Sequence, residues 1–177
     1  MIRSLRILTL SCTALTVATG LALAQQLTVT VNRITEAGVG DKIGTVVVAQ
    51  SKYGTTFNVA VTGLPQGPRG FHVHEKGDCG PATKDGKMTA GDAAGAHYDP
   101  EQKKSHKGPT GAGHKGDLPV LNGTDKGISQ TVTAPQLKLA DLKGRALVIH
   151  EGGDNYSDQP KHGGGKGRVA CSVVPNQ

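Results

Sequence analysis

Hydrophobic and polar residues alternate in short segments along most of the chain. In QLTVTVNRIT (26–35), a leucine and two valines alternate with threonines and an asparagine. A period of two residues is typical of a strand with one buried and one exposed face. Similar segments predict further strands at 44–50, 55–63, 70–75, 128–134, 145–150 and 168–174. Several short strands separated by turn residues predict an all-β fold, an antiparallel sandwich or barrel.

Two long segments interrupt this pattern. Residues 76–127 are rich in Gly, Asp, Lys and Pro and contain no convincing strand. Residues 151–167 form a second irregular segment between the last two strands. Long loops within a compact domain are either functional or disordered.

The first 24 residues, MIRSLRILTLSCTALTVATGLALA, have the composition of a secretory signal peptide. Arg3 and Arg6 precede an apolar run that ends in small residues. A membrane anchor is the alternative, but the run is near the lower length limit for a span and polar residues interrupt it. We therefore predict cleavage after Ala24, a mature domain at 25–177, a periplasmic or secreted location and no stable membrane insertion.

The number of cysteines left after removal of the predicted signal peptide is compatible with an exported protein. Of three cysteines, Cys12 lies in the predicted signal peptide, too early in the apolar run for lipid attachment to be favoured. Cys79 and Cys171 remain, and an even number in an exported chain predicts one disulfide. Two free thiols are the alternative.

The charge of the chain is mildly positive. Without Arg3 and Arg6, 18 basic residues face 14 acidic ones. The charges are scattered and the chain has only two Phe, three Tyr and no Trp. Nucleic-acid binding would favour a concentrated basic stripe, often with stacking aromatics. A mild positive excess fits a small anionic substrate or a negatively charged surface equally well, and alone it does not decide between them.

Histidines are confined to one part of the chain, because all seven lie between residues 72 and 162. His72 and His74 are two residues apart in a predicted strand, so both project from the same face. The others are His97, His106, His114, His150 and His162. A glycine-rich loop cannot bury a core of its own, and a metal ion would order it.

The residue types predict two kinds of metal site. His106, His114 and Asp117 with one further histidine would give three nitrogens and one oxygen, a set suited to tetrahedral Zn²⁺. His72, His74 and His150 come from predicted strands and would form an all-imidazole site, suited to copper, zinc, iron or nickel. Spacing alone does not choose among these metals.

Five segments carry a resemblance to a known family. They are GFHVHEKGDC (70–79), DGKMTAGDAAGAHYDP (85–100), SHKGPTGAGHKGDLP (105–119), ALVIHEGGDNYSDQP (146–160) and GGGKGRVAC (163–171). In this order they resemble the copper,zinc superoxide dismutases of the bacterial periplasmic type. The resemblance implies an eight-stranded antiparallel Greek-key β-barrel with long metal-binding and electrostatic loops.

The resemblance also implies a role for each residue of the site. Copper would be bound by His72, His74, His97 and His150. Zinc would be bound by His97, His106, His114 and Asp117. His97 would bridge both metals, and Asp154 would link a copper ligand to a zinc ligand. Arg168 would lie beside copper, Cys79 and Cys171 would form the disulfide, and His162 is extra to the metal set and expected to face solvent.

The implied reaction is disproportionation of superoxide to O₂ and H₂O₂ by a redox-cycling copper ion bridged through a histidine to a structural zinc. His97, which would exchange a proton, and Arg168, which would attract the anion, are the expected catalytic residues. Lys161 and Lys166 are candidates for longer-range steering.

Three other functions compete with this one. A zinc hydrolase leaves half of the ligands unexplained, and a non-catalytic copper carrier on the same barrel needs neither Arg168 nor a zinc set. A structural β-sandwich leaves the clustered histidines without a purpose. The sequence does not choose between a monomer and a homodimer.

Overall fold

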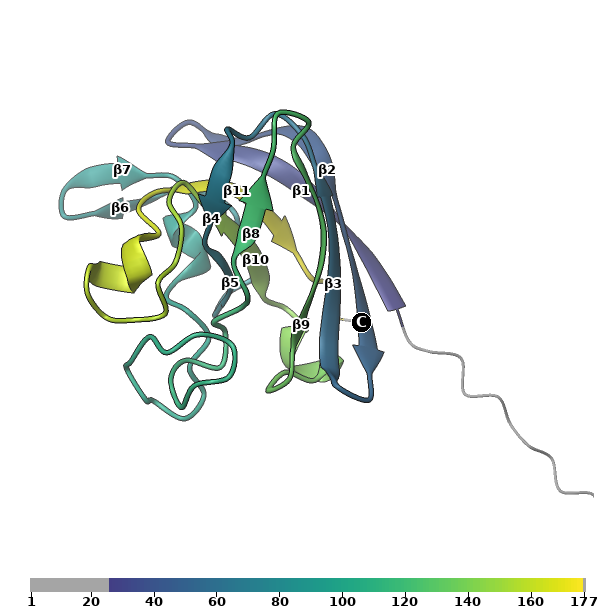
Figure 1. Ribbon diagram of the computed structural model, residues 1–177. Coiled ribbons are helices and arrows are strands. Elements are labelled where there is room, and N and C mark those ends of the chain that lie inside the picture. Colours follow the sequence, from purple (N-terminus) through teal and green to yellow (C-terminus); the bar gives the residue numbers. More distant parts are fainter. Residues whose placement is uncertain (1–25, 177) are drawn as a thin grey trace, which may run out of the picture.

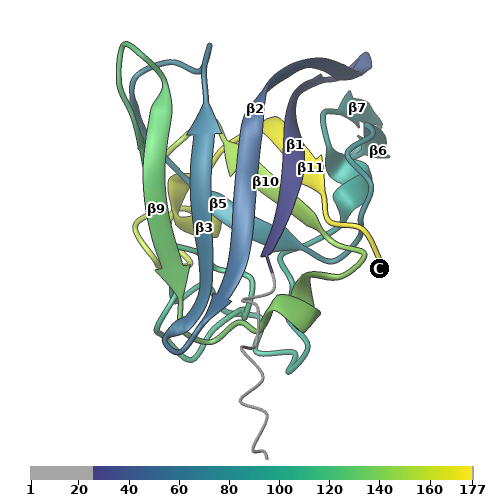
Figure 2. The ribbon, with the colours of Figure 1, turned by 90° about the vertical axis from the view of Figure 1, so that its right-hand side faces the viewer.

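The computed structural model describes residues 26–176. The predicted signal peptide and its cleavage site lie outside these residues. One antiparallel sheet dominates the fold, in the order β5-β10-β11-β1-β2-β3-β9, and Figures 1 and 2 show that it is strongly curled. Its strands are β1 (Gln26–Thr35), β2 (Gly38–Ser51), β3 (Gly54–Val61), β5 (Phe71–His74), β9 (Ile128–Ala134), β10 (Ala146–His150) and β11 (Arg168–Val173).

Two pairs of three-residue strands complete the β structure of the described part of the chain. Strand β4 (Gly67–Arg69) pairs with β8 (Leu121–Gly123), and β6 (Ala82–Lys84) pairs with β7 (Lys87–Thr89). Three 3-10 helices are η1 (Asp92–Ala94), η2 (Leu139–Leu142) and η3 (Lys161–Gly164). The predicted all-β antiparallel class is confirmed, and the count of eight barrel strands stays a prediction.

The expectation that residues 76–127 lack strands was wrong, because β6, β7 and β8 lie within them. Each of these strands has three residues. That is too short for a two-residue alternation to stand out from loop sequence.

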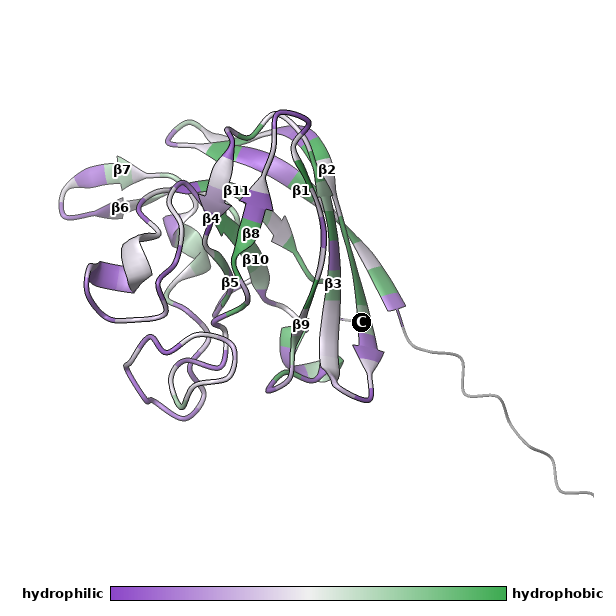
Figure 3. Ribbon diagram, viewed as in Figure 1, coloured by the Kyte–Doolittle hydropathy of each residue, from purple (hydrophilic) through white to green (hydrophobic). Residues whose placement is uncertain are grey.

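The alternating segments bury their apolar face. In β3 the side chains of Phe57, Val59 and Val61 are buried, whereas Asn58 and Ala60 between them are exposed. Figure 3 shows hydrophobic residues along the strands and mostly hydrophilic residues in the long loops. The pattern of the sequence therefore fixes which face of the sheet covers the core.

Strands β5 and β10 are buried on both faces. Phe71 faces the core, where its ring packs edge to face on Phe57 with centroids 5.6 Å apart. The alternate positions of β5 are His72 and His74, each fully buried. Their face is covered by the long loops rather than by a second sheet, so the strands carry the histidines into a closed site.

A disulfide joins Cys79 to Cys171 across a separation of 92 positions, with Cα atoms 5.8 Å apart. The predicted disulfide is confirmed. It ties the segment after β5 to β11, the strand that begins with Arg168.

Removing the disulfide is expected to lower the free energy of unfolding by roughly 2–4 kcal/mol, because the unfolded chain regains loop entropy; chain-entropy arithmetic for this span sets an upper value of about 4–5 kcal/mol. Urea unfolding of the oxidised protein and of a Cys79→Ser/Cys171→Ser double variant measures the difference. Equal unfolding midpoints would contradict the expectation. Thiol titration of the unfolded, non-reduced mature chain should find no free thiol.

Candidate metal centre

The first long loop is held in place by the free edge of β5. The amide of Tyr98 donates to the carbonyl of Val73, and the amide of Val73 donates to the carbonyl of Gly116, both at 2.8 Å. Isolated bridges pair His72 with Asp117 and His74 with His97. Backbone hydrogen bonds thus bring loop residues that are distant in sequence beside the strand histidines.

Four buried histidines form the first cluster, which we call the four-histidine group. Its members are His72, His74, His97 and His150, and one ring nitrogen from each lies within 4.8 Å of all the others. The Nε2 atoms of His74 and His150 are 3.4 Å apart. The Nδ1 of His74 donates to the carbonyl of Gly95 at 2.9 Å, which leaves its Nε2 free to bind a metal.

The second cluster surrounds one carboxylate oxygen, and we call it the Asp117 group. Its members are His97, His106, His114 and Asp117. Oδ1 of Asp117 lies 2.9 Å from Nδ1 of His106, 3.1 Å from that of His97 and 3.4 Å from that of His114. Ligands about 2.0 Å from a tetrahedral Zn²⁺ lie about 3.3 Å from one another. The separations at Asp117 therefore suit a zinc ion.

One ligand atom from each of four residues lies within 4.8 Å of the other three in a set that overlaps the Asp117 group. This set contains His72, His97, His106 and Asp117, and it does not include the predicted ligand His114. The Nε2 of His72 is already 2.7 Å from Asp154. Within the described residues, Nδ1 of His72 and Nδ1 of His150 have no hydrogen-bond partner, whereas Nδ1 of His106 and Nδ1 of His114 both approach Oδ1 of Asp117. Such orphaned buried nitrogens need a partner, and a metal ion fits this donor set.

Asp154 lies between the two groups. Its Oδ2 is 2.7 Å from Nε2 of His72, and its Oδ1 is 2.7 Å from Nε2 of His106. The carboxylate therefore orients one ring from each group. Carboxylates that hydrogen-bond to metal-binding histidines, without binding the metal themselves, commonly have this role.

The environment sets the charge of these groups. Burial lowers the pKa of His72, His74 and His97, and lowers that of His150 to about 3, so these imidazoles are neutral at pH 7. Burial opposes charge at His106 as well, but hydrogen bonds to Asp117 and Asp154 raise its pKa to about 9.

Metal-free protein is therefore expected to be most stable near neutral pH. Between pH 6.5 and 3 the unfolded chain binds a proton at His150 that the folded chain does not bind, so stability falls as pH falls. Between pH 6.5 and 9 the folded chain keeps a proton at His106 that the unfolded chain loses, so stability falls as pH rises. Urea unfolding of chelator-treated protein at several pH values measures this. A stability that rose steadily toward acidic pH would contradict it.

Arg168 borders a cavity of about 440 Å³ that we call the arginine cavity. Its Nη1 donates to the carbonyl of Gly91 at 2.5 Å and its Nη2 to that of Gly95 at 2.7 Å. His97 and His150 line the same cavity, together with Lys84, Lys161 and Lys166. Arg168 is thus both a loop anchor and part of a cationic wall beside the four-histidine group.

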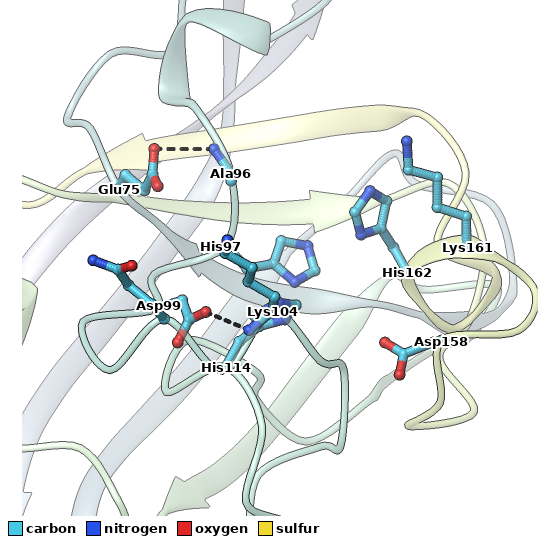
Figure 4. A pocket seen from close by; sticks show the side chains of 10 residues that line it. Glu75, Ala96, His97, Asp99, Lys104, His114, Asp158, Lys161 and His162 are labelled. Atoms are coloured by element: carbon cyan, nitrogen blue, oxygen red, sulfur yellow. Dashed lines mark hydrogen bonds between the residues drawn. The ribbon is translucent and has the colours of Figure 1, made fainter.

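A second cavity of about 540 Å³ opens beside the Asp117 group, and we call it the carboxylate cavity. Three acidic side chains line it, those of Glu75, Asp99 and Asp158. Figure 4 shows these residues around His97 and His114.

His162 faces solvent only in part. Its side chain is half-buried, lines both cavities, and places its ring centroid 5.1 Å from that of His97. Burial, with the neighbouring charges, lowers its pKa to about 4. The backbone at His162 and Gly163 forms a left-handed turn at this point.

Two contributions were missed by the sequence analysis. Lys84 reaches the arginine cavity from β6, a strand that the alternation of hydrophobic and polar residues did not predict. The carbonyl of Gly95 accepts hydrogen bonds from both His74 and Arg168, and a backbone acceptor leaves no signal in the spacing of side chains.

Within residues 26–176, no helix has the length and hydrophobicity needed to cross a membrane.

Comparisons with known proteins agree with this geometry. A family model described as copper/zinc superoxide dismutase matches residues 42–174. The superoxide dismutase [Cu-Zn] of Escherichia coli (strain K12) is 48% identical over 168 residues, 93% of this chain and 96% of the relative. The solved Cu/Zn superoxide dismutase from Brucella abortus is 47% identical with a TM-score of 0.83, covering 85% of this chain and 99% of that one.

A solution structure of the monomeric copper, zinc superoxide dismutase from Salmonella enterica is also similar. It has a TM-score of 0.76 and 49% identity, over 85% of this chain and 99% of that one. The family model spans most of the sheet and both long loops, and the relatives match nearly their whole length. The chain belongs to the copper/zinc superoxide dismutase family.

Proposed function

We propose that the protein binds one copper and one zinc ion and converts superoxide to O₂ and H₂O₂. The observation that carries this proposal is the position of His97, which belongs to both ligand groups. One imidazole has two nitrogens, so a single ring can hold two metals side by side. Neither a lone hydrolytic zinc nor a simple carrier requires such a ring.

Copper is assigned to the four-histidine group, His72, His74, His97 and His150. An all-imidazole set suits copper, and the neutral rings leave their lone pairs available. His72 would bind through Nδ1, because its Nε2 is engaged by Asp154. His74 would bind through Nε2, because its Nδ1 is engaged by Gly95.

Zinc is assigned to the Asp117 group. His114 is preferred over His72 as its fourth ligand, because Nδ1 of His114 faces Oδ1 of Asp117 at 3.4 Å and the copper group already uses His72. Although burial opposes charge on Asp117, hydrogen bonds from His106, His114 and His97 hold its pKa well below the usual range. The carboxylate is therefore ionised and ready to bind a cation.

When bound, copper would supply the electron chemistry, in which one superoxide is oxidised to O₂ and a second, with two protons, is reduced to H₂O₂. Arg168, which stays protonated at neutral pH, draws the anion into the arginine cavity. Nδ1 of His97 faces Asp117, so Nε2 is the atom that can hold a proton and pass it to the product. Asp154 holds the rings of His72 and His106 in fixed orientations.

Two single substitutions test the ligand assignments. His74→Ala is expected to lose copper and keep zinc, because His74 belongs to the four-histidine group only. His114→Ala is expected to lose most of its zinc and keep copper. Metal analysis of each purified variant gives the answer. Retention of copper by His74→Ala, or of full zinc by His114→Ala, would refute the corresponding assignment.

Residues 1–24 are proposed to direct export and to be cleaved after Ala24, leaving a single domain at 25–177. The Cys79–Cys171 disulfide and the bacterial relatives support a periplasmic location. Mass spectrometry of the protein from the periplasmic fraction tests the cleavage site. A homodimer remains a proposal, and light scattering of the metal-loaded protein measures the oligomeric state.

A further inference from the structure

His162 lies as close to His97 as the residues assigned to share a metal with it. The ring centroids of His162 and His97 are 5.1 Å apart. The corresponding distances from His97 are 5.0 Å to His74, 5.4 Å to His114 and 5.9 Å to His150. The spacing of His162 is therefore within the range over which two imidazoles here are placed around one ion.

The His162 ring is also free to bind. Among residues 26–176, the structure gives it no hydrogen bond and no ion pair. Its backbone is left-handed, with φ 54° and ψ 40°, and the next residue, Gly163, has φ 65°. Histidine is one of the few non-glycine residues that adopt this region with some frequency. The turn leaves an unengaged imidazole beside His97, as Figure 4 shows.

The ligands of the copper group have very little exposed surface. The side chains of His72 and His74 are fully buried, and those of His97 and His150 are nearly so. The Asp117 group differs, because the His114 side chain is 15% exposed and can meet an incoming ion directly. The copper group has no exposed ligand of its own, whereas the half-buried His162 lines both of the cavities that His97 lines.

The two cavities differ in charge. The arginine cavity is lined by four cationic side chains and only one carboxylate, Asp92. The carboxylate cavity has three carboxylates against two lysines, Lys104 and Lys161. A metal cation is therefore favoured through the carboxylate cavity and a small anion through the arginine cavity. His162 lies where the two meet.

We propose that His162 is a loading ligand for copper: it binds the incoming ion at the mouth of the site, together with His97, and passes it by ligand exchange to the four-histidine group. The inference rests on the copper assignment above. The exchange involves no change in oxidation state, since one imidazole replaces another. After loading, His162 is released from the ion.

Copper uptake by zinc-loaded, copper-free protein tests this proposal. Cu(I) is supplied from a coloured chelator complex, and the colour change reports the rate of transfer. The two main variants are His162→Leu and His162→Met, which are similar in size and equally strained in a left-handed turn. Only methionine offers a thioether, which binds Cu(I) well. His162→Asn tolerates the left-handed backbone and serves as a second variant without a good copper ligand. Zinc content and circular dichroism check folding.

His162→Leu and His162→Asn are expected to take up copper about tenfold more slowly, the lower end of the range for losing a supporting group at a metal site. His162→Met should stay within about threefold of the unsubstituted protein. All four proteins should reach one copper per chain with the same spectrum of the oxidised site.

Equal uptake rates for His162→Leu and the unsubstituted protein would overturn the proposal. Equally slow uptake by His162→Leu and His162→Met would also overturn it, because the ring would then act only by its shape. If the unsubstituted protein bound no copper in the four-histidine group, the copper assignment itself would fail.

Discussion

Replacing His97 with alanine is expected to remove both metals and to lower kcat/KM for superoxide by on the order of 10³-fold or more, the scale of losing a central catalytic group. Nδ1 of His97 lies 3.1 Å from Asp117, and the same ring belongs to the four-histidine group. The substitution removes one ligand from the four-histidine group and one from the Asp117 group. Each site then has three ligands and a cavity where the ring had been.

Metal analysis and superoxide decay after pulse radiolysis measure these losses. His114→Ala is the matched control, because it also removes one imidazole of the Asp117 group but leaves the four-histidine group complete. The control should lose zinc and keep copper. If His97→Ala kept both metals at normal stoichiometry, the assignment of a shared ligand would be wrong.

Replacing Arg168 with alanine is expected to lower kcat/KM at low salt by roughly one to three orders of magnitude, the range of electrostatic steering. The guanidinium lies in the wall of the arginine cavity with His97 and His150. Superoxide is a small anion with few groups to recognise, so charge selects it better than shape. Both metals should be retained, because His74 keeps its own hydrogen bond to Gly95.

The hydrogen bonds of Arg168 to Gly91 and Gly95 make a purely structural role the competing explanation. Arg168→Lys separates the two roles, since lysine keeps the charge but lacks the planar fork that reaches both carbonyls. An electrostatic role predicts that lysine restores much of the rate. It also predicts a rate that falls with added salt, as the screening length shortens from about 10 Å at 0.1 M to 3 Å at 1 M.

Lys126→Ala provides the charge control, because Lys126 is exposed in the turn before β9 and does not line the arginine cavity. It should change the rate little. Wild-type activity at low salt in Arg168→Ala, with full metal content, would show that the arginine is structural.

Part of this site could be predicted from strand geometry alone. His72 and His74 share a face of β5 because strand side chains repeat every two residues, and the structure buries both on that face. His97, His106 and His114 could not be placed in this way. Their positions depend on backbone hydrogen bonds such as that between Val73 and Gly116, and these have no counterpart in residue spacing.

The position of His162 beside His97 could not be predicted for a similar reason. In the sequence, His162 is one more histidine of a loop. The segment KHGGG (161–165) does not predict a left-handed turn at the histidine itself. The short strands β6, β7 and β8 were missed because three residues carry too little pattern. Long alternating strands such as β3 were predicted correctly because their burial follows the sequence directly.

The central claim is that two metal sites share His97 and that together they consume superoxide. Metal content and superoxide decay, measured on the same preparation of mature protein, test it most directly. One copper and one zinc per chain, with rapid superoxide decay that stops when copper alone is withdrawn, is the predicted result. Full zinc and copper occupancy without superoxide consumption, or activity that survives complete loss of copper, would contradict the account.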